Sequence, residues 1–205
     1  MTPQRSARSR GQSRPALPRA PQGVNGQNFF DAPELWHEPR EVEANHKKTL
    51  KIVVQPPGAG YVHAVTPAEI RARILWLPNA VQQQLDVVQL SRMTRKRSRF
   101  PMYGLQWGTA VYLYPLEAFL VEQFQRIPSP AWQIETEMYG GKWQQANGLW
   151  QLVWTPKTLK DFYLNNILIH EIGHVIDKRN SNTRDRERFA NWFAIEYGYR
   201  PSRGR

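Results

Sequence analysis

The chain has 205 residues, no cysteine and a formal net charge of +11 at neutral pH. This length suffices for one compact domain and a tail, and the lack of cysteine excludes disulfides and thiolate metal ligands. No stretch is apolar over the roughly 18 residues of a membrane span, and the N-terminus lacks the apolar core of a signal peptide. We therefore expect a cytoplasmic protein whose positive charge permits contact with nucleic acid or another anionic partner.

Residues 1–48 are predicted to form a tail and a poorly structured lead-in. Residues 1–28 combine arginine with proline, glycine and serine and contain no acidic residue, a composition typical of disorder. An arginine- and serine-rich, acid-free start is also typical of an organelle transit peptide. His37 and His46 in the lead-in are interpreted as surface histidines rather than metal ligands.

A single α+β domain is expected over residues 49–200. An alternating apolar pattern predicts a first strand at 50–54, and a proline- and glycine-rich turn leads into a short strand at 61–64. Thr66-Pro67-Ala68-Glu69 predicts the capped start of a helix. A second helix is expected from Pro78, with an apolar face formed by Val81, Leu85 and Val88.

The middle of the chain alternates basic, apolar and aromatic segments. We expect a basic loop from Arg92 to Arg99, which is a second candidate contact for an anionic partner, and a strand at 109–114. Pro115 is predicted to open a helix with one apolar face, formed by Leu116, Phe119, Leu120, Phe124 and Ile127. An antiparallel meander follows, with strands at 134–139, 142–145 and 149–154 and with turns at Gly140-Gly141 and Asn147-Gly148.

The segment His170-Glu171-Ile172-Gly173-His174 carries the most specific pattern in the chain. Residues four apart on an α-helix leave the same face, so both imidazoles can hold one metal ion. Glu171 then lies close enough to reach a water on the metal without binding the metal itself, which is the general-base position of a zinc hydrolase.

The surrounding sequence predicts that this segment is a buried helix. Thr158 starts a candidate capping box, and Thr155-Pro156 is an alternative start one turn earlier. The chain then has no proline as far as Lys178, and a broad apolar face is formed by Leu164, Ile167, Leu168, Ile172, Val175 and Ile176. Burying two histidines and a glutamate is costly unless they have partners, and a metal ion would be one.

Glu187 is the candidate third ligand. It lies in a second predicted helix at 186–197, which Asn182 or Thr183 could cap and which a short turn makes an antiparallel neighbour of the first. His174 and Glu187 each lie about four residues from that turn, so at roughly 1.5 Å per residue they are level with each other. The rival carboxylate, Glu196, lies about nine residues, or roughly 13 Å, further along the helix.

Ligating histidines usually donate their second ring N–H to an oxygen atom. Asn191, four residues after Glu187 on the same face, offers such an acceptor. Asp177, three residues after His174, could do the same or could be an ordinary polar residue at the helix end.

The two motifs, His170 to His174 and Glu187-Arg188-Phe189-Ala190-Asn191, together resemble the gluzincin metallopeptidases, most closely the small soluble minigluzincins. The resemblance covers roughly residues 155–198, and Asn191 stands where the family typically has aspartate. It implies a zincin-like fold, in which a small antiparallel or mixed sheet packs on the active-site helix and a second helix carries the third ligand. It also implies one Zn²⁺ held by His170, His174 and Glu187, Glu171 as base, and a peptide that pairs with an edge strand.

The main hypothesis is therefore a zinc-dependent metalloendopeptidase that acts on peptide or protein substrates. Candidate donors for the reaction's oxyanion are Tyr163, Tyr197 and Tyr199, none of which ranks above a packing role. No histidine follows His174, which excludes the zinc proteases that use a third histidine. The alternatives are a non-catalytic regulatory, nucleic-acid-binding or partner-binding protein on the same fold, and a chance motif in a structural helix.

Overall fold

The computed structural model describes residue 37 and residues 49–99 and 101–204. The predicted tail and lead-in, including His46 but not His37, lie outside the described residues. His37 is half-buried against the main sheet, where its backbone N–H donates to the Gln89 side chain and its ring lies 2.8 Å from Nζ of Lys51. Among the described residues, no helix is long and apolar enough to span a membrane.

The chain has the expected mixed α+β composition and is built on a four-stranded sheet with the order β1-β3-β5-β4. Its strands are β1 (Lys51–Val54), β3 (Val87–Leu90), β5 (Ala110–Leu113) and β4 (Gly104–Trp107). The first three are parallel, whereas β4 pairs antiparallel with β5 and forms one edge. The central strands β3 and β5 are buried along their whole length, as expected for strands covered on both faces.

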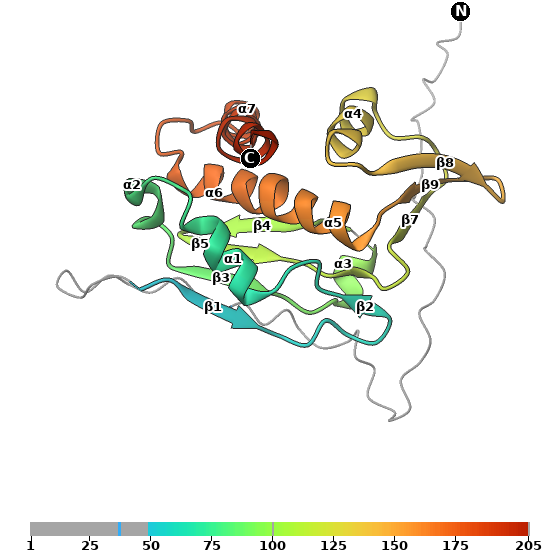
Figure 1. Cartoon of the computed structure of the whole chain (residues 1–205), viewed down its shortest axis with the longest axis horizontal. Coiled ribbons are helices and arrows are strands. Elements are labelled where there is room, and N and C mark those ends of the chain that lie inside the picture. Colours follow the sequence, from blue (N-terminus) through green and yellow to red (C-terminus); the bar gives the residue numbers. More distant parts are fainter. Residues whose placement is uncertain (1–36, 38–48, 100, 205) are drawn as a thin grey trace, which may run out of the picture.

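A long helical layer covers one face of this sheet (Figure 1). It is a continuous run of α5 (Pro156–Phe162), the π-helical segment η1 (Tyr163–Ile167) and α6 (Leu168–Ile176). Alternate strand residues such as Val88 and Val111 join the core beneath these helices, whereas Val87 and Tyr112 belong to a separate buried cluster. This period of two is the pleat of a strand buried on both faces.

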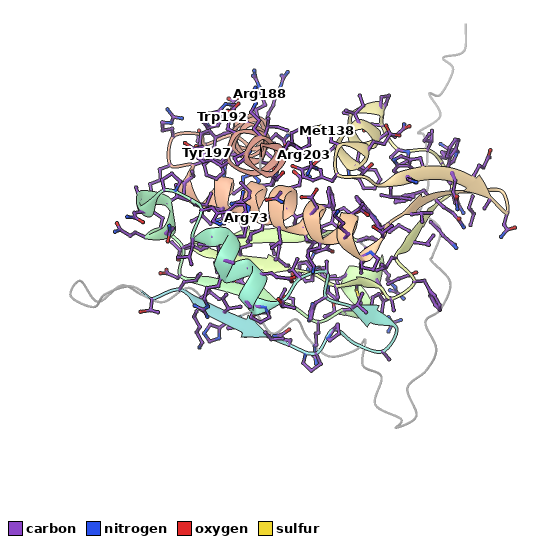
Figure 2. The ribbon with its side chains drawn as sticks, viewed as in Figure 1. Arg73, Met138, Arg188, Trp192, Tyr197 and Arg203 are labelled. Carbon is purple, nitrogen blue, oxygen red and sulfur yellow. The ribbon has the colours of Figure 1, made fainter. Side chains whose placement is uncertain are left out.

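Further helices and a short pairing complete the main unit. The helices are α1 (Pro67–Ile74), α2 (Asn79–Gln82) and α3 (Arg95–Arg99), and the pairing joins β2 (Tyr61–Val62) to β6 (Leu116–Glu117). Thr66 caps α1 reciprocally with Glu69, as predicted. From α1, Arg73 points toward the helical layer and donates to the side chain of Asn165 and to the carbonyl of Tyr197 (Figure 2).

A second, three-stranded sheet projects beside α4 (Pro130–Met138) at one end of the helical layer (Figure 1). Its order is β7-β9-β8, from β7 (Val121–Phe124), β9 (Leu149–Val153) and β8 (Lys142–Ala146). The predicted Asn147-Gly148 turn joins β8 to β9, and both residues have the positive φ that such a hairpin requires.

The predicted helix from Pro115 is wrong. The segment forms β6 and β7, joined by a turn at Ala118 and Phe119; Phe119 is 89% exposed, and Leu120 after the turn has a φ of 57°. Its apolar residues fit a helical period, but β7 pairs along its whole length with β9, about 30 residues later. Pairing between distant segments therefore overrides the local pattern.

The strand predicted at 134–139 is also wrong, because this segment lies in α4. Pro130 occupies the first turn of α4, where its missing N–H costs no hydrogen bond. Gly140, with a φ of 87°, ends the helix, so it is a helix cap rather than a turn between strands.

Two further segments differ from the prediction. The helix after Pro78 ends at Gln82, so Val88 lies in the central strand β3 instead of on a helical face. The basic loop contains the short helix α3, in which Arg97 is buried with its guanidinium over the ring of Tyr114. At least this member of the basic cluster has a packing role.

Candidate metal centre

The two motif histidines leave one face of α6, as their spacing predicts. The helical run that carries them starts at the earlier of the two predicted positions, because Thr155 caps it together with Thr158, and Pro156 occupies its first turn. The run ends at Asp177, whose backbone is extended. Within it, the Nε2 atoms of His170 and His174 lie 3.1 Å apart.

Glu187 supplies the third potential ligand from α7 (Thr183–Phe193), which Asn182 caps through the backbone N–H of Asp185. Its Oε2 lies 3.4 Å from Nε2 of His170, and its Oε1 lies 3.4 Å from Nε2 of His174. Two ligands at the usual 2.0–2.1 Å from a tetrahedral metal ion lie about 3.3 Å apart. The three side chains could therefore hold a metal ion with almost no movement.

Close helix packing brings Glu187 to the histidines. A Cβ added to Gly173 would lie 3.0 Å from Cα of Ala190, so the glycine inside the first motif and the alanine inside the second allow α6 and α7 to touch. The π-helical segment η2 (Ala194–Tyr199) continues α7, and a Cβ on Gly198 would overlap the carbonyl oxygen of Asn165. As α7 and η2 advance, these contacts move backward along α6 and η1, so the two helices are antiparallel.

The rival carboxylate does not belong to this group. Glu196 lies in η2 and pairs with Arg200, with Oε1 of the glutamate 2.8 Å from Nη1 of the arginine. Within the described residues, only His170, His174 and Glu187 form a group of three or more possible metal-binding side chains.

The site keeps both histidines in the neutral form that binds metals. Burial, together with the neighbouring His174, lowers the pKa of His170 to about 4, against the opposing effects of Glu187 and Asn191. Burial also lowers the pKa of His174, and the positive charge of Arg186 acts in the same direction. Both imidazoles therefore have a lone pair for a metal ion at neutral pH.

The two predicted supports of the histidines behave differently. The side chain of Asn191 is a hydrogen-bond partner of His170, which is the place predicted for it. Asp177 instead closes the turn after α6, where it accepts hydrogen bonds from the backbone N–H groups of Arg179 and Asn180. Nδ1 of His174 is buried and has no hydrogen-bond partner among the described residues.

Glu171 lies between α6 and the edge strand β4. A Cβ added to Gly104 would lie 2.8 Å from both Cγ and Oε1 of Glu171, so the absence of a side chain at position 104 makes room for the carboxylate. Burial, together with the negative charge of Glu187, raises the pKa of Glu171 to about 8. A buried carboxylate beside three potential metal ligands is typical of a functional site.

Comparisons with models of known protein families, with curated proteins and with solved structures find no match to this chain. The resemblance to gluzincins therefore rests on the two motifs and on the geometry of their side chains.

The three candidate tyrosines have packing roles. The hydroxyl of Tyr163 is buried and donates to the carbonyl of Tyr114. Tyr197 stacks on Phe193, and Tyr199 packs against the ring of Tyr139. None of these contacts involves a residue of the metal group.

Sequence reasoning missed three residues around the site. Gly104 and Gln106 lie on β4, a short strand with no clear alternation, and Gly104 has no side chain that a pattern could register. Arg186 directly precedes Glu187 and donates from Nη2 to Oε1 of Gln106, so it links α7 to β4. Its position next to a predicted ligand was the one signal available in the sequence.

Proposed function

We propose that this chain is a zinc-dependent metalloendopeptidase in which His170, His174 and Glu187 hold one zinc ion and Glu171 is the general base. The observation that carries the proposal is the set of three distances, 3.1, 3.4 and 3.4 Å, between the candidate ligand atoms. They match the edges of a tetrahedron around zinc, which are about 3.3 Å long. The resemblance of both motifs to gluzincins supports the same assignment.

The donor set favours zinc over harder cations. Two imidazoles and one carboxylate suit zinc, whereas calcium and magnesium prefer oxygen ligands alone. The side chain of Glu187 is 51% exposed, so the site is open to solvent on that side, as a catalytic centre with a free position requires. When bound, zinc supplies a Lewis acid that polarises a carbonyl group and acidifies a water molecule.

Glu171 carries the proton transfers in this proposal. Its carboxylate accepts a proton from the attacking water and donates it to the leaving amine. Burial and the negative charge of Glu187 together favour the protonated acid, with a pKa of about 8. The positive charge of a metal ion at the neighbouring ligands opposes this effect and favours the ionised base.

The edge strand β4 is the candidate site for an extended peptide. In the resembled family, the substrate pairs with an edge strand above the metal, and β4 is the edge strand that borders α6 and Glu171. Main-chain pairing with such a strand supplies affinity with little dependence on sequence. This arrangement favours cleavage within a chain.

Metal content and peptidase turnover of four purified proteins test the proposal. Wild type should bind one zinc per chain by elemental mass spectrometry, and Glu187→Ala should lose it. Glu196→Ala is the matched control, because it removes a carboxylate from the same helical run outside the metal group. Glu171→Gln should keep zinc and lose turnover.

Folded wild-type protein that takes up no zinc, even after incubation with the metal, would refute the proposal. So would zinc that survives Glu187→Ala and is lost in Glu196→Ala. Zinc binding without cleavage of any peptide in a degenerate library would leave a metal-binding protein and remove the peptidase assignment.

A further inference from the structure

Arg186 links α7 to the edge strand β4 beside the candidate metal centre. It is the residue before Glu187 on α7, and its Nη2 donates to Oε1 of Gln106 on β4 at 3.1 Å. Gln106 points to the same face of the strand as Gly104, two residues earlier, which contacts Glu171. The guanidinium therefore lies between α7 and the edge strand, close enough to His174 for its positive charge to act on that histidine.

Arg186 has no ion-pair partner among the described residues, and the negative charge that acts on it from further away is the carboxylate of Asp177 at the end of α6. Among the described residues, it forms no ion pair within 4.0 Å, and its hydrogen-bond partner, Gln106, is a neutral amide. Its Nε is buried and finds no hydrogen-bond acceptor in the described part of the chain. A partly buried guanidinium with an unused donor is costly unless a ligand uses it.

Helix stability does not explain this residue. Arg186 lies in the first turns of α7, where the helix dipole favours negative charge and disfavours a cation. Gln106 is itself fixed, because its Nε2 donates to the carbonyl of Gly108 in the turn between β4 and β5. Its Oε1 is thereby turned toward Arg186, and the guanidinium is held in place by a neutral group.

We propose that Arg186 binds a carboxylate of the substrate beside the metal centre. This inference rests on the proposed peptidase function and specifies its substrate class. The planar guanidinium matches a carboxylate with two parallel hydrogen bonds, and the unused Nε–H is one of the donors that such a pair employs. The carboxylate belongs either to an aspartate or glutamate side chain or to the C-terminus of the peptide.

The strand geometry sets where this carboxylate lies. Gly104 is level with the base Glu171, and Gln106 lies two residues further, which is about 6.8 Å along a strand. A peptide paired with β4 would therefore present its carboxylate one or two residues from the scissile bond. As an endopeptidase, the site selects peptides with an acidic residue at that distance, whereas a free C-terminus bound there would mean that one or two C-terminal residues are removed instead.

The surrounding surface has matching charge. Three exposed basic residues border the same end of α6 and α7, namely Lys178, Arg179 and Arg184. With Arg186 they make four basic residues against three acidic ones over 177–187, and one of those acids is the candidate ligand Glu187. A positive rim of this kind attracts anionic peptides from solution and raises their association rate.

Paired peptides measure the predicted preference. Peptides identical except for Glu or Gln near the scissile bond, each made with a free or an amidated C-terminus, are compared in turnover by zinc-loaded wild type. Their binding is measured by fluorescence anisotropy on zinc-loaded Glu171→Gln, which does not depend on catalysis. We expect the carboxylate form to bind about 10- to 100-fold more tightly, the range for a hydrogen bond to a charged group.

The preference for the carboxylate peptides should disappear when Arg186→Gln is introduced into wild type, measured by turnover, and into the Glu171→Gln protein, measured by binding. Arg188→Gln is the matched control, since it removes the same charge from a side chain that is 75% exposed and projects away from the sheet (Figure 2). Arg186→Lys keeps the charge without the planar fork and should retain only part of the preference. If Arg186→Gln does not fold, Arg186→Lys is the variant in which the loss of preference is measured.

A preference that is lost in Arg186→Gln and kept in Arg188→Gln supports the proposal, and the peptide pair that shows it identifies the source of the carboxylate. Equal binding of all peptides by the Glu171→Gln protein, or an equal loss for all of them in Arg186→Gln, would overturn it. Absence of turnover in wild type, together with carboxylate-selective binding, would remove the peptidase function and leave Arg186 as a carboxylate-binding residue.

Discussion

Replacing Gly104 with alanine tests whether the edge strand positions Glu171. The added Cβ would lie 2.8 Å from Cγ and Oε1 of Glu171 and 2.9 Å from Cγ2 of Ile167. Ordinary contacts between such atoms lie at about 3.5–4.0 Å. Either the carboxylate or the strand must therefore move by roughly 0.7 Å or more.

This displacement predicts a defect in turnover with the metal retained. A displacement of about 1 Å in a catalytic group can reduce a rate by about 100-fold, and overpacking a buried position costs about 1–3 kcal/mol of folding free energy. We therefore expect Gly104→Ala to lower kcat by about 10- to 100-fold and to leave one zinc per chain.

The assay measures kcat, zinc content and the free energy of unfolding on the same preparations. Gly204→Ala is the matched control, because the nearest atom to its added Cβ is 3.9 Å away and its φ is −94°. Full turnover in Gly104→Ala would refute the reasoning, since Glu171 would then act from a position other than the one against β4. Loss of zinc would show instead that the contact supports the ligands.

Two further predictions concern packing and pH. Gly173→Ala places a Cβ 3.0 Å from Cα of Ala190, so α7, which carries Glu187, must move away from α6. We expect zinc affinity, measured by competition with a chelator, to fall by about 10-fold or more. Unchanged zinc affinity would contradict this prediction. Glu122 is half-buried, its carboxylate accepts hydrogen bonds from Tyr103 and Trp154, and desolvation of the carboxylate raises its pKa to about 7. The folded chain therefore holds the Glu122 proton more tightly than the unfolded chain, whose carboxyl pKa is near 4.5. The protonated carboxyl stabilises the folded chain at low pH, and this stabilisation declines as pH rises from 4.5 through 7, by about 3 kcal/mol in total. Urea unfolding at pH 5 and pH 8 should show that Glu122→Gln removes this part of the pH dependence, and an identical dependence in both proteins would exclude it.

The sequence predicted the helical half of the candidate site well, because its signals are local. Two histidines four residues apart share a helix face wherever the helix lies, and the capping residues Thr155 and Asn182 lie within three residues of the helix starts they cap. Glu187 was within reach because the connection between the helices is short, so the positions of both helices relative to their turn could be counted. The assignment of zinc and of catalysis stays a prediction.

The β-structure was predicted less well, since its signals are not local. Leu116 to Phe124 fits a helical period, yet the segment forms strands because partners at Tyr61–Val62 and Leu149–Val153 pair with it. The strand at 104–107 is too short, and its apolar and polar residues alternate too little, for the sequence to predict it. Pairing partners far along the chain decide such segments.

By itself, the sequence determined the chemical identity of the candidate site, because the residue types and their helical spacing are properties of a short segment. Only the tertiary structure decided how that site is enclosed. It placed Gly104 against Glu171, matched the three candidate ligand distances to a tetrahedron and set Arg186 between α7 and β4. The contact between Gly104 and Glu171 joins residues 67 positions apart, and that between Gln106 and Arg186 joins residues 80 positions apart. Their geometry depends on how helices and sheet pack rather than on any periodicity in the chain.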